Sequence, residues 1–140
     1  MDIEIALAHG TTTAELYKSN LEVARPATLV LAHGAGAGRR HPFMVGFARA
    51  LSDRGLDVLT FNFLYMEQRR RVPDRMPQLL ECYAAAIAAA REHLSSARER
   101  LFIGGKSMGG RAATHVAAQS AGLHGIVLLG YPLHPPGRPD

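Results

Sequence analysis

The stretch Leu101-Phe102-Ile103-Gly104-Gly105-Lys106-Ser107-Met108-Gly109-Gly110-Arg111 decides how this chain folds. A short apolar run ends in glycines, one serine follows, and further glycines lead into an alanine-rich segment of helical character. This order predicts a strand, a tight turn and a helix, with Ser107 at the tip of the turn. Its core is a Gly-x-Ser-x-Gly pattern, which is typical of a nucleophile elbow.

The residue types at this turn suit acyl-transfer chemistry. A nucleophile elbow strains the backbone of its serine so that the hydroxyl stands clear of the sheet. Gly105 and Gly109 are expected to leave room where the strand and the helix pass closely. Met108 is expected to offer its backbone N–H, at the positive end of the helix dipole, to an oxyanion. Ser107 is therefore the candidate nucleophile and Met108 a candidate oxyanion donor.

The same stretch has two other possible interpretations. Gly-Lys-Ser invites a phosphate-binding loop, but that motif needs a glycine five positions before Gly105, and Arg100 stands there. The second alternative is a glycine-rich turn without chemistry, because glycine and serine are common residues. The predicted strand before the turn and the predicted helix after it favour the elbow.

The composition predicts one globular domain covering residues 1–140. The apolar fraction of 47% is ordinary for a folded chain, and no apolar run is long enough to span a bilayer. The first residues lack the pattern of a signal peptide, and a single cysteine, Cys82, precludes an internal disulfide. We therefore expect a cytoplasmic protein without membrane contact, and Cys82 to be a buried helix residue.

The net charge of +4 comes mainly from arginine, with clusters at Arg39-Arg40 and 69–71. No recognition motif supports nucleic-acid binding, although the charge leaves that interpretation open. The simplest explanation of the arginine clusters is that they lie on the solvent-exposed surface. The sharper one is that arginines at the mouth of an active site attract anionic substrates.

The order of elements predicts an α/β fold. Strands are expected at Asp2–Ala8, Glu15–Val23, Thr28–Ala32, Leu56–Phe61, Arg100–Gly104 and Gly125–Leu129, with a turn at Gly10–Thr13. Helices are expected from Pro42 to a stop at Gly55, from Pro77 to about Ala97, and after Ser107 to about Ala121, with loops at Asn62–Pro73 and Tyr131–Asp140. From the third strand onward, strands alternate with helices. This alternation predicts a three-layer α/β/α sandwich with a mostly parallel sheet.

A second glycine-rich turn, His33-Gly34-Ala35-Gly36-Ala37-Gly38, follows the buried third strand. Hydrolases with a Gly-x-Ser-x-Gly elbow place their other oxyanion donor at this point, because glycines let backbone N–H groups face inward. We expect the Ala35 N–H to be that donor, with Gly36 as the neighbouring alternative. His33 is expected to be structural, and a merely flexible loop remains the alternative for the turn.

Four blocks in order make the chain similar to a known family: 31–38, 61–67, 104–111 and 130–137. With these blocks the chain resembles the α/β-hydrolase superfamily, in particular small predicted hydrolases related to the hydrolase-like domain of a non-specific-lethal-complex subunit. The resemblance covers nearly the whole chain. It implies Ser107 as nucleophile, Met108 and the turn at Ala35 as oxyanion donors, and no metal or organic cofactor.

The sequence departs from this family at its end. Relatives continue with two more strands, which carry the catalytic acid and the histidine, whereas this chain stops after the sixth. We therefore expect a truncated product or fragment, or a sixth strand whose edge is covered by another chain such as a second copy. His134 is the best candidate base among the histidines, and Asp140 is the candidate acid.

The function predicted is a serine hydrolase acting through Ser107 on an ester, thioester or similar acyl bond of a small molecule. Arg39, Arg40, Arg69 and Arg111 are expected to favour an anionic substrate. The alternative is a catalytically incomplete, hydrolase-like binding module, because the acid and the histidine of the triad are missing. A nucleic-acid-binding protein is a third alternative.

Overall fold

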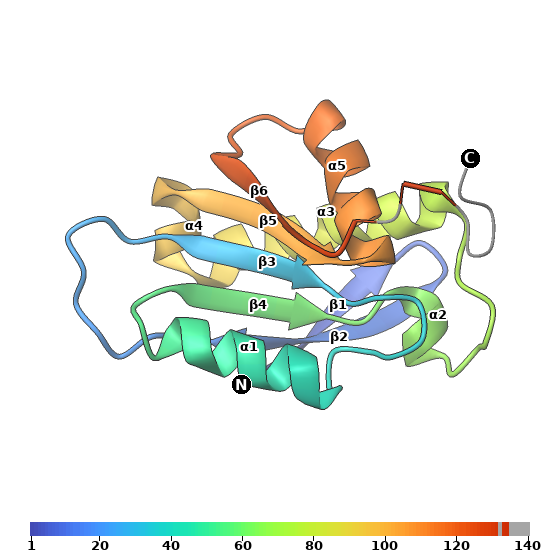
Figure 1. Cartoon of the computed structure of the whole chain (residues 1–140), viewed down its shortest axis with the longest axis horizontal. Helices are drawn as coiled ribbons and strands as arrows, with labels where there is room; N and C mark the ends of the chain where they lie inside the picture. The colour runs from blue at the N-terminus through green and yellow to red at the C-terminus, as the bar shows by residue number, and fades with distance from the viewer. Residues whose placement is uncertain (132, 135–140) are drawn as a thin grey trace.

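A computed structural model describes residues 1–131 and 133–134. It contains one six-stranded sheet in the order β1-β2-β4-β3-β5-β6 (Figure 1). The strands are β1 (Asp2–Leu7), β2 (Gly10–Tyr17), β3 (Thr28–Ala32), β4 (Asp57–Phe61), β5 (Leu101–Lys106) and β6 (Gly125–Leu129). The four strands from β3 to β6 are parallel, and β1 and β2 join them as an antiparallel hairpin. The mostly parallel sheet is as predicted.

Helices cover both faces of the sheet, which makes the three predicted layers. One face carries α1 (Pro42–Ser52), and the other carries α3 (Met76–His93), α4 (Ser95–Glu99) and α5 (Met108–Gln119) (Figure 1). A one-turn helix, α2 (Leu64–Glu67), lies beside the carboxyl ends of the parallel strands. No helix in the described ranges is long and apolar enough to cross a membrane.

The amino-terminal hairpin differs from the prediction. Residues 10–13 were expected to be a turn, but β2 begins at Gly10 and the turn consists only of Ala8 and His9, because Leu7 pairs with Gly10. The strand also ends at Tyr17 rather than at Val23. Three consecutive threonines favour extended backbone, and Thr12 is fully buried by the sheet, so this segment is strand rather than turn.

The long predicted helix is broken at Leu94. The α3 helix ends at His93, Leu94 adopts an extended conformation, and α4 begins at Ser95. Leu94 is 1% exposed, so the break turns its side chain into the core. Ser96, the next buried residue, donates a hydrogen bond to Asp57 at 2.5 Å and shares another with Thr28 at 2.6 Å. These long-range contacts compensate for the interrupted helix.

Tyr83 of α3 fixes the centre of the sheet below the elbow. Its buried hydroxyl lies 2.8 and 2.6 Å from the carbonyl oxygens of Val30 and Gly104, which share its one proton, and it accepts from the Gly104 N–H at 2.9 Å. A side chain from the helical layer thus reaches two neighbouring parallel strands, β3 and β5. The two strands that lead into the candidate site are therefore held together from behind.

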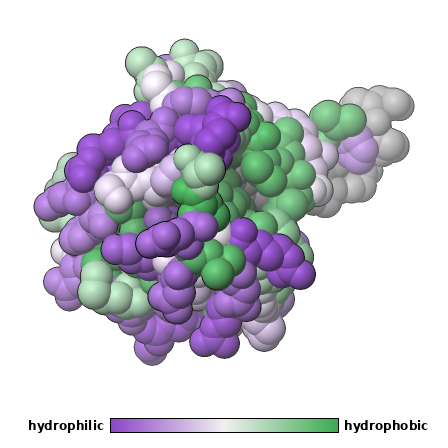
Figure 2. All heavy atoms as spheres, turned by 90° about the vertical axis from the view of Figure 1, so that its left-hand side faces the viewer, coloured by the Kyte–Doolittle hydropathy of each residue, from purple (hydrophilic) through white to green (hydrophobic). Residues whose placement is uncertain are grey.

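The sheet ends at β6, which pairs with β5 alone among the described residues. Two of its apolar side chains, Ile126 and Leu128, are 41% and 44% exposed. Figure 2 shows hydrophobic residues, in green, gathered on the right-hand side of that view. The apolar edge expected from the sequence is therefore present.

Candidate functional site

Ser107 forms a sharp bend between β5 and α5. Its φ of 53° and ψ of −113° lie outside the common regions for a residue with a side chain, and only Arg69 shares a positive φ among the described non-glycine residues. The Ser107 N–H donates to the Leu129 carbonyl at 3.0 Å, and its own carbonyl accepts from the Arg111 N–H at 3.1 Å. The strained elbow conformation predicted for Ser107 is confirmed.

The glycines beside Ser107 have the steric role expected of them. A Cβ on Gly105 would lie 2.4 Å from the backbone carbon of Gly109, and a Cβ on Gly109 would lie 2.5 Å from the His33 carbonyl oxygen. Real Cβ atoms do not approach backbone this closely. Glycine is therefore required at both positions for α5 to pack directly on the ends of β5 and β3.

The turn after β3 faces Ser107. A Cβ on Gly34 would lie 3.8 Å from the Cβ of Ser107 and 3.4 Å from the Lys106 carbonyl oxygen. Between them lies an open pocket of about 320 Å³. Its walls are formed by Gly34, Ala35, Gly36, Ala37, His41, Met44, Lys106 and Ser107. Two glycine-rich motifs that are far apart in the sequence thus share one pocket.

His33 holds the start of this turn from the buried side. It is fully buried, and its Nε2 accepts a hydrogen bond from the Phe63 N–H at 3.0 Å. A nitrogen that accepts carries no proton, so Nδ1 carries it and donates to the Gly34 carbonyl at 2.6 Å. Burial lowers the pKa of His33 to about 4, which keeps the ring neutral. The predicted structural role of His33 agrees with these contacts.

The segment after β4 holds the rest of the turn, and sequence reasoning missed this role. The Tyr65 hydroxyl donates to the Ala35 carbonyl at 2.8 Å. The Asn62 side-chain oxygen accepts from the Arg39 N–H at 2.9 Å. The sequence predicts a loop from Asn62 to Pro73, whereas Leu64–Glu67 form the α2 helix. The sequence signal for this role is that one asparagine and one tyrosine stand among apolar residues, which is typical of a buried segment with hydrogen-bonding side chains.

Arg39 was expected to attract an anionic substrate, but it does not line the pocket beside Ser107. Its side chain is 2% exposed and lies 3.5 Å from carboxylate oxygens of both Asp2 and Glu15. Its Nε also donates to the Thr13 hydroxyl at 3.1 Å. A buried guanidinium needs such partners, and with them it ties the turn to the hairpin. Arg40 is exposed and pairs with Asp2 at 3.2 Å.

The cation that does line the pocket is Lys106. Its ammonium lies 4.6 Å from the centre of the Phe43 ring, in a cation–π contact. No carboxylate of the described residues is within ion-pair distance of it. His41 is beside it in the pocket wall, and its Nδ1 accepts from the Phe43 N–H at 3.1 Å, which leaves Nε2–H as the donor of the neutral ring. Arg69 and Arg111 are exposed but do not line this pocket.

The base and the acid that would act with the Ser107 hydroxyl stay predictions. None of the hydrogen bonds among residues 1–131 and 133–134 involves its Oγ. His134 is exposed and follows β6, and Asp140 lies outside the described residues. Ser107 and Met108 are both partly exposed at the elbow. Within the same ranges no group of three or more His, Cys, Asp or Glu side chains could hold a metal ion.

Comparison with solved structures shows the fold. A dienelactone hydrolase from Anabaena variabilis superposes with a TM-score of 0.77 at 20% identity, covering 94% of this chain and 62% of that one. A serine hydrolase without a lid from Xanthomonas campestris gives 0.72 at 20% identity, covering 85% and 56%. An α/β hydrolase, GrgF, from a Penicillium species gives 0.78 at 15% identity, covering 94% and 45%.

Sequence comparison shows the family. The quorum-quenching protein AidA of Acinetobacter baumannii is 30% identical over 130 residues, which are 91% of this chain and 42% of that protein. The chain thus spans less than half the length of this curated relative. The family model described as an alpha/beta hydrolase domain matches residues 25–140, which include the strained serine and both glycine-rich turns. The chain therefore belongs to the alpha/beta hydrolase domain family.

Proposed function

We propose that this chain carries the nucleophile and the oxyanion donors of a serine hydrolase that cleaves esters, thioesters or similar acyl bonds. The observation that supports this most is Ser107, held in a strained bend at the wall of a pocket whose opposite wall is a glycine-rich turn. The Ser107 hydroxyl would attack the acyl carbon, and the carbonyl oxygen would become an oxyanion. The N–H groups of Met108 and Ala35 would stabilise that charge.

The attack also needs a base, since a serine hydroxyl near neutral pH is a weak nucleophile. We propose His134 as the base that this chain itself can offer, because it follows the sixth strand at the rim of the sheet where Ser107 lies. Replacing it by glutamine tests the role. Loss of the pH dependence of Ser107 modification supports it, and an unchanged pH profile means that the base lies elsewhere.

Labelling with a fluorophosphonate probe tests the nucleophile directly. The probe phosphonylates an activated serine, so wild-type protein should be labelled and Ser107→Ala should not. Ser95→Ala removes an exposed hydroxyl at the other end of the sheet, and it serves as the matched control. No labelling of folded wild-type protein would contradict the enzyme proposal.

That negative result would favour the second candidate function, a hydrolase-like binding module without catalysis. The specific observation behind it is that no described side chain hydrogen bonds to the Ser107 hydroxyl. Under this alternative the pocket would still bind small acyl compounds. Binding measured by calorimetry, together with unchanged ligand after incubation, would identify it.

We propose an anionic acyl compound as the substrate, recognised by Lys106 rather than by arginines. Lys106 is next to the nucleophile, and its ammonium has no described carboxylate partner to neutralise it. Lys106→Gln should reduce labelling by a carboxylate-bearing probe more than labelling by a neutral one. Arg40→Gln, which removes an exposed charge outside the pocket, should leave that ratio unchanged. Quorum-sensing signal molecules belong in the substrate panel because of the quorum-quenching relative.

A further inference from the structure

Two successive carbonyl groups of the turn after β3 accept hydrogen bonds from side chains that lie on the side opposite the pocket. The Gly34 carbonyl accepts from the His33 ring, and the Ala35 carbonyl accepts from the Tyr65 hydroxyl. His33 and Tyr65 are both fully buried, and neither lines the pocket that Ser107 shares with Gly34, Ala35 and Gly36. The two acceptors thus face the core.

The direction of these carbonyls fixes the direction of two N–H groups. No described peptide bond is cis, and in a planar trans peptide the C=O and the N–H point to opposite sides. The N–H of Ala35 shares its peptide with the Gly34 carbonyl, and the N–H of Gly36 shares its peptide with the Ala35 carbonyl. Both N–H groups therefore point away from the core, toward the pocket side. Neither has an acceptor among the residues that the structure describes.

We propose that Tyr65 is a positioning residue for the oxyanion hole: its hydroxyl fixes the Ala35–Gly36 peptide so that the Gly36 N–H joins that of Ala35 in facing an oxyanion on Ser107. This inference rests on the proposed function. It changes the expected donor set, in which Gly36 was only an alternative to Ala35. It also gives the tyrosine of the 61–67 block a role in the reaction.

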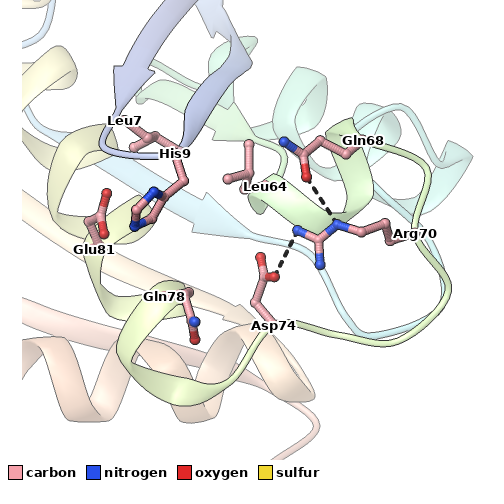
Figure 3. Close-up of a pocket in the computed structure, with 8 residues that line it drawn as sticks. All are labelled: Leu7, His9, Leu64, Gln68, Arg70, Asp74, Gln78 and Glu81. Carbon is pink, nitrogen blue, oxygen red and sulfur yellow. Dashed lines mark hydrogen bonds and ion pairs between the residues drawn. The ribbon is translucent and has the colours of Figure 1, made fainter.

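Tyr65 is built to hold one orientation. Its backbone N–H donates to the Asp74 carboxylate at 2.9 Å, and its carbonyl accepts from the Arg70 N–H at 2.8 Å. Arg70 in turn binds the other oxygen of Asp74 at 3.0 Å, and its Nε donates to Gln68 (Figure 3). These side chains form one wall of a second pocket, of about 190 Å³, on the outer side of α2. Burial, and secondarily the charge of Asp74, raise the pKa of the Tyr65 hydroxyl to about 12, so it remains a donor in ordinary buffers.

A purely structural role is the competing explanation, because any buried hydroxyl needs a hydrogen-bond partner. The two roles differ in what they change. A structural hydroxyl alters the stability of the whole protein, and any loss of reaction then follows the folded fraction. A positioning hydroxyl alters the rate of the chemical step in protein that remains folded.

The test compares Tyr65→Phe with Tyr17→Phe, which removes a hydroxyl from another buried tyrosine at the opposite end of the sheet. Rate constants for fluorophosphonate labelling are measured at several probe concentrations, to separate the labelling step from probe binding. Loss of one oxyanion donor costs about 100- to 1,000-fold. A donor that is misaligned but present should cost roughly 10- to 100-fold. We expect this loss for Tyr65→Phe with unchanged probe binding, and less than about a twofold change for Tyr17→Phe.

A second measurement keeps this inference separate from the proposed function. Backbone ¹⁵N relaxation should show increased motion at Ala35, Gly36 and Ala37 in Tyr65→Phe and not in Tyr17→Phe. If wild-type protein is never labelled, the proposed function fails, while the relaxation data still test whether Tyr65 orders the turn. Labelling of folded Tyr65→Phe at the wild-type rate, a loss that only follows its folded fraction, or an equally rigid turn would each overturn the inference.

Discussion

Replacing Ser107 by glycine should stabilise the protein while abolishing its reaction with acyl probes. Ser107 adopts a φ of 53° and a ψ of −113°, which glycine reaches without steric cost. A residue held in such a sparsely populated region carries about 1–3 kcal/mol of strain. About 0.4–1 kcal/mol of this stabilisation is offset, because glycine increases the conformational entropy of the unfolded chain. The expected net gain is about 0.5–2 kcal/mol, or a melting temperature roughly 2–7 °C higher.

The matched control is Ser107→Ala, which removes the same hydroxyl but keeps the Cβ and therefore the strain. Urea denaturation followed by circular dichroism gives the free energy of unfolding of both variants and of wild-type protein. We expect the alanine variant to be close to wild type and the glycine variant to be the most stable of the three. A glycine variant no more stable than the alanine variant would refute strain at this bend.

Four further predictions follow from the contacts described above. Gly109→Ala should destabilise the protein by about 1–3 kcal/mol in urea denaturation, because its Cβ would lie 2.5 Å from a backbone oxygen, whereas Gly36→Ala has open space and should be tolerated. Burial lowers the pKa of His33 from 6.5 to about 4, so the unfolded chain binds that proton more readily. The free energy of unfolding should therefore fall by about 3 kcal/mol as the pH is lowered from 6.5 to 4. A His33→Gln variant whose free energy of unfolding has the same pH dependence would contradict this. Burial raises the pKa of the Cys82 thiol to about 12, so a disulfide reagent should modify it only after unfolding, and rapid modification of folded protein would count against its burial. If a second copy covers β6, light scattering should give about twice 15.1 kDa and Ile126→Lys should lower that mass, whereas a monomeric wild type would exclude it.

The parallel half of the sheet and the elbow were predictable because their signals are local. Thr28–Ala32 is buried at every position, as its unbroken apolar run indicates for an inner parallel strand. Glycine at Gly105 and Gly109 marks the close crossing of strand and helix. Proline at Pro42, the first residue of α1, begins that helix where proline costs no hydrogen bond.

Other features could not be predicted because distant residues decide them. Leu94 would continue a helix by its own propensity, but burial of its side chain at 1% exposure ends the helix there. The α2 helix has a carboxylate from Asp74 at its first turn, an acceptor that no local pattern announces. Arg39 looked like a surface charge until the hairpin placed Asp2 and Glu15 around it.

By itself, the sequence determined a strand, a strained serine turn and a helix. These features depend on steric contacts between neighbouring residues, which the positions of glycine, proline and apolar residues indicate directly. Only the tertiary structure decided which groups hold the opposite turn. His33 directly precedes the turn, but Tyr65 comes from a short helix 30 residues away, and each reaches a carbonyl because burial obliges its polar atoms to find partners. The orientation of the peptide groups in that turn is therefore a property of the folded molecule.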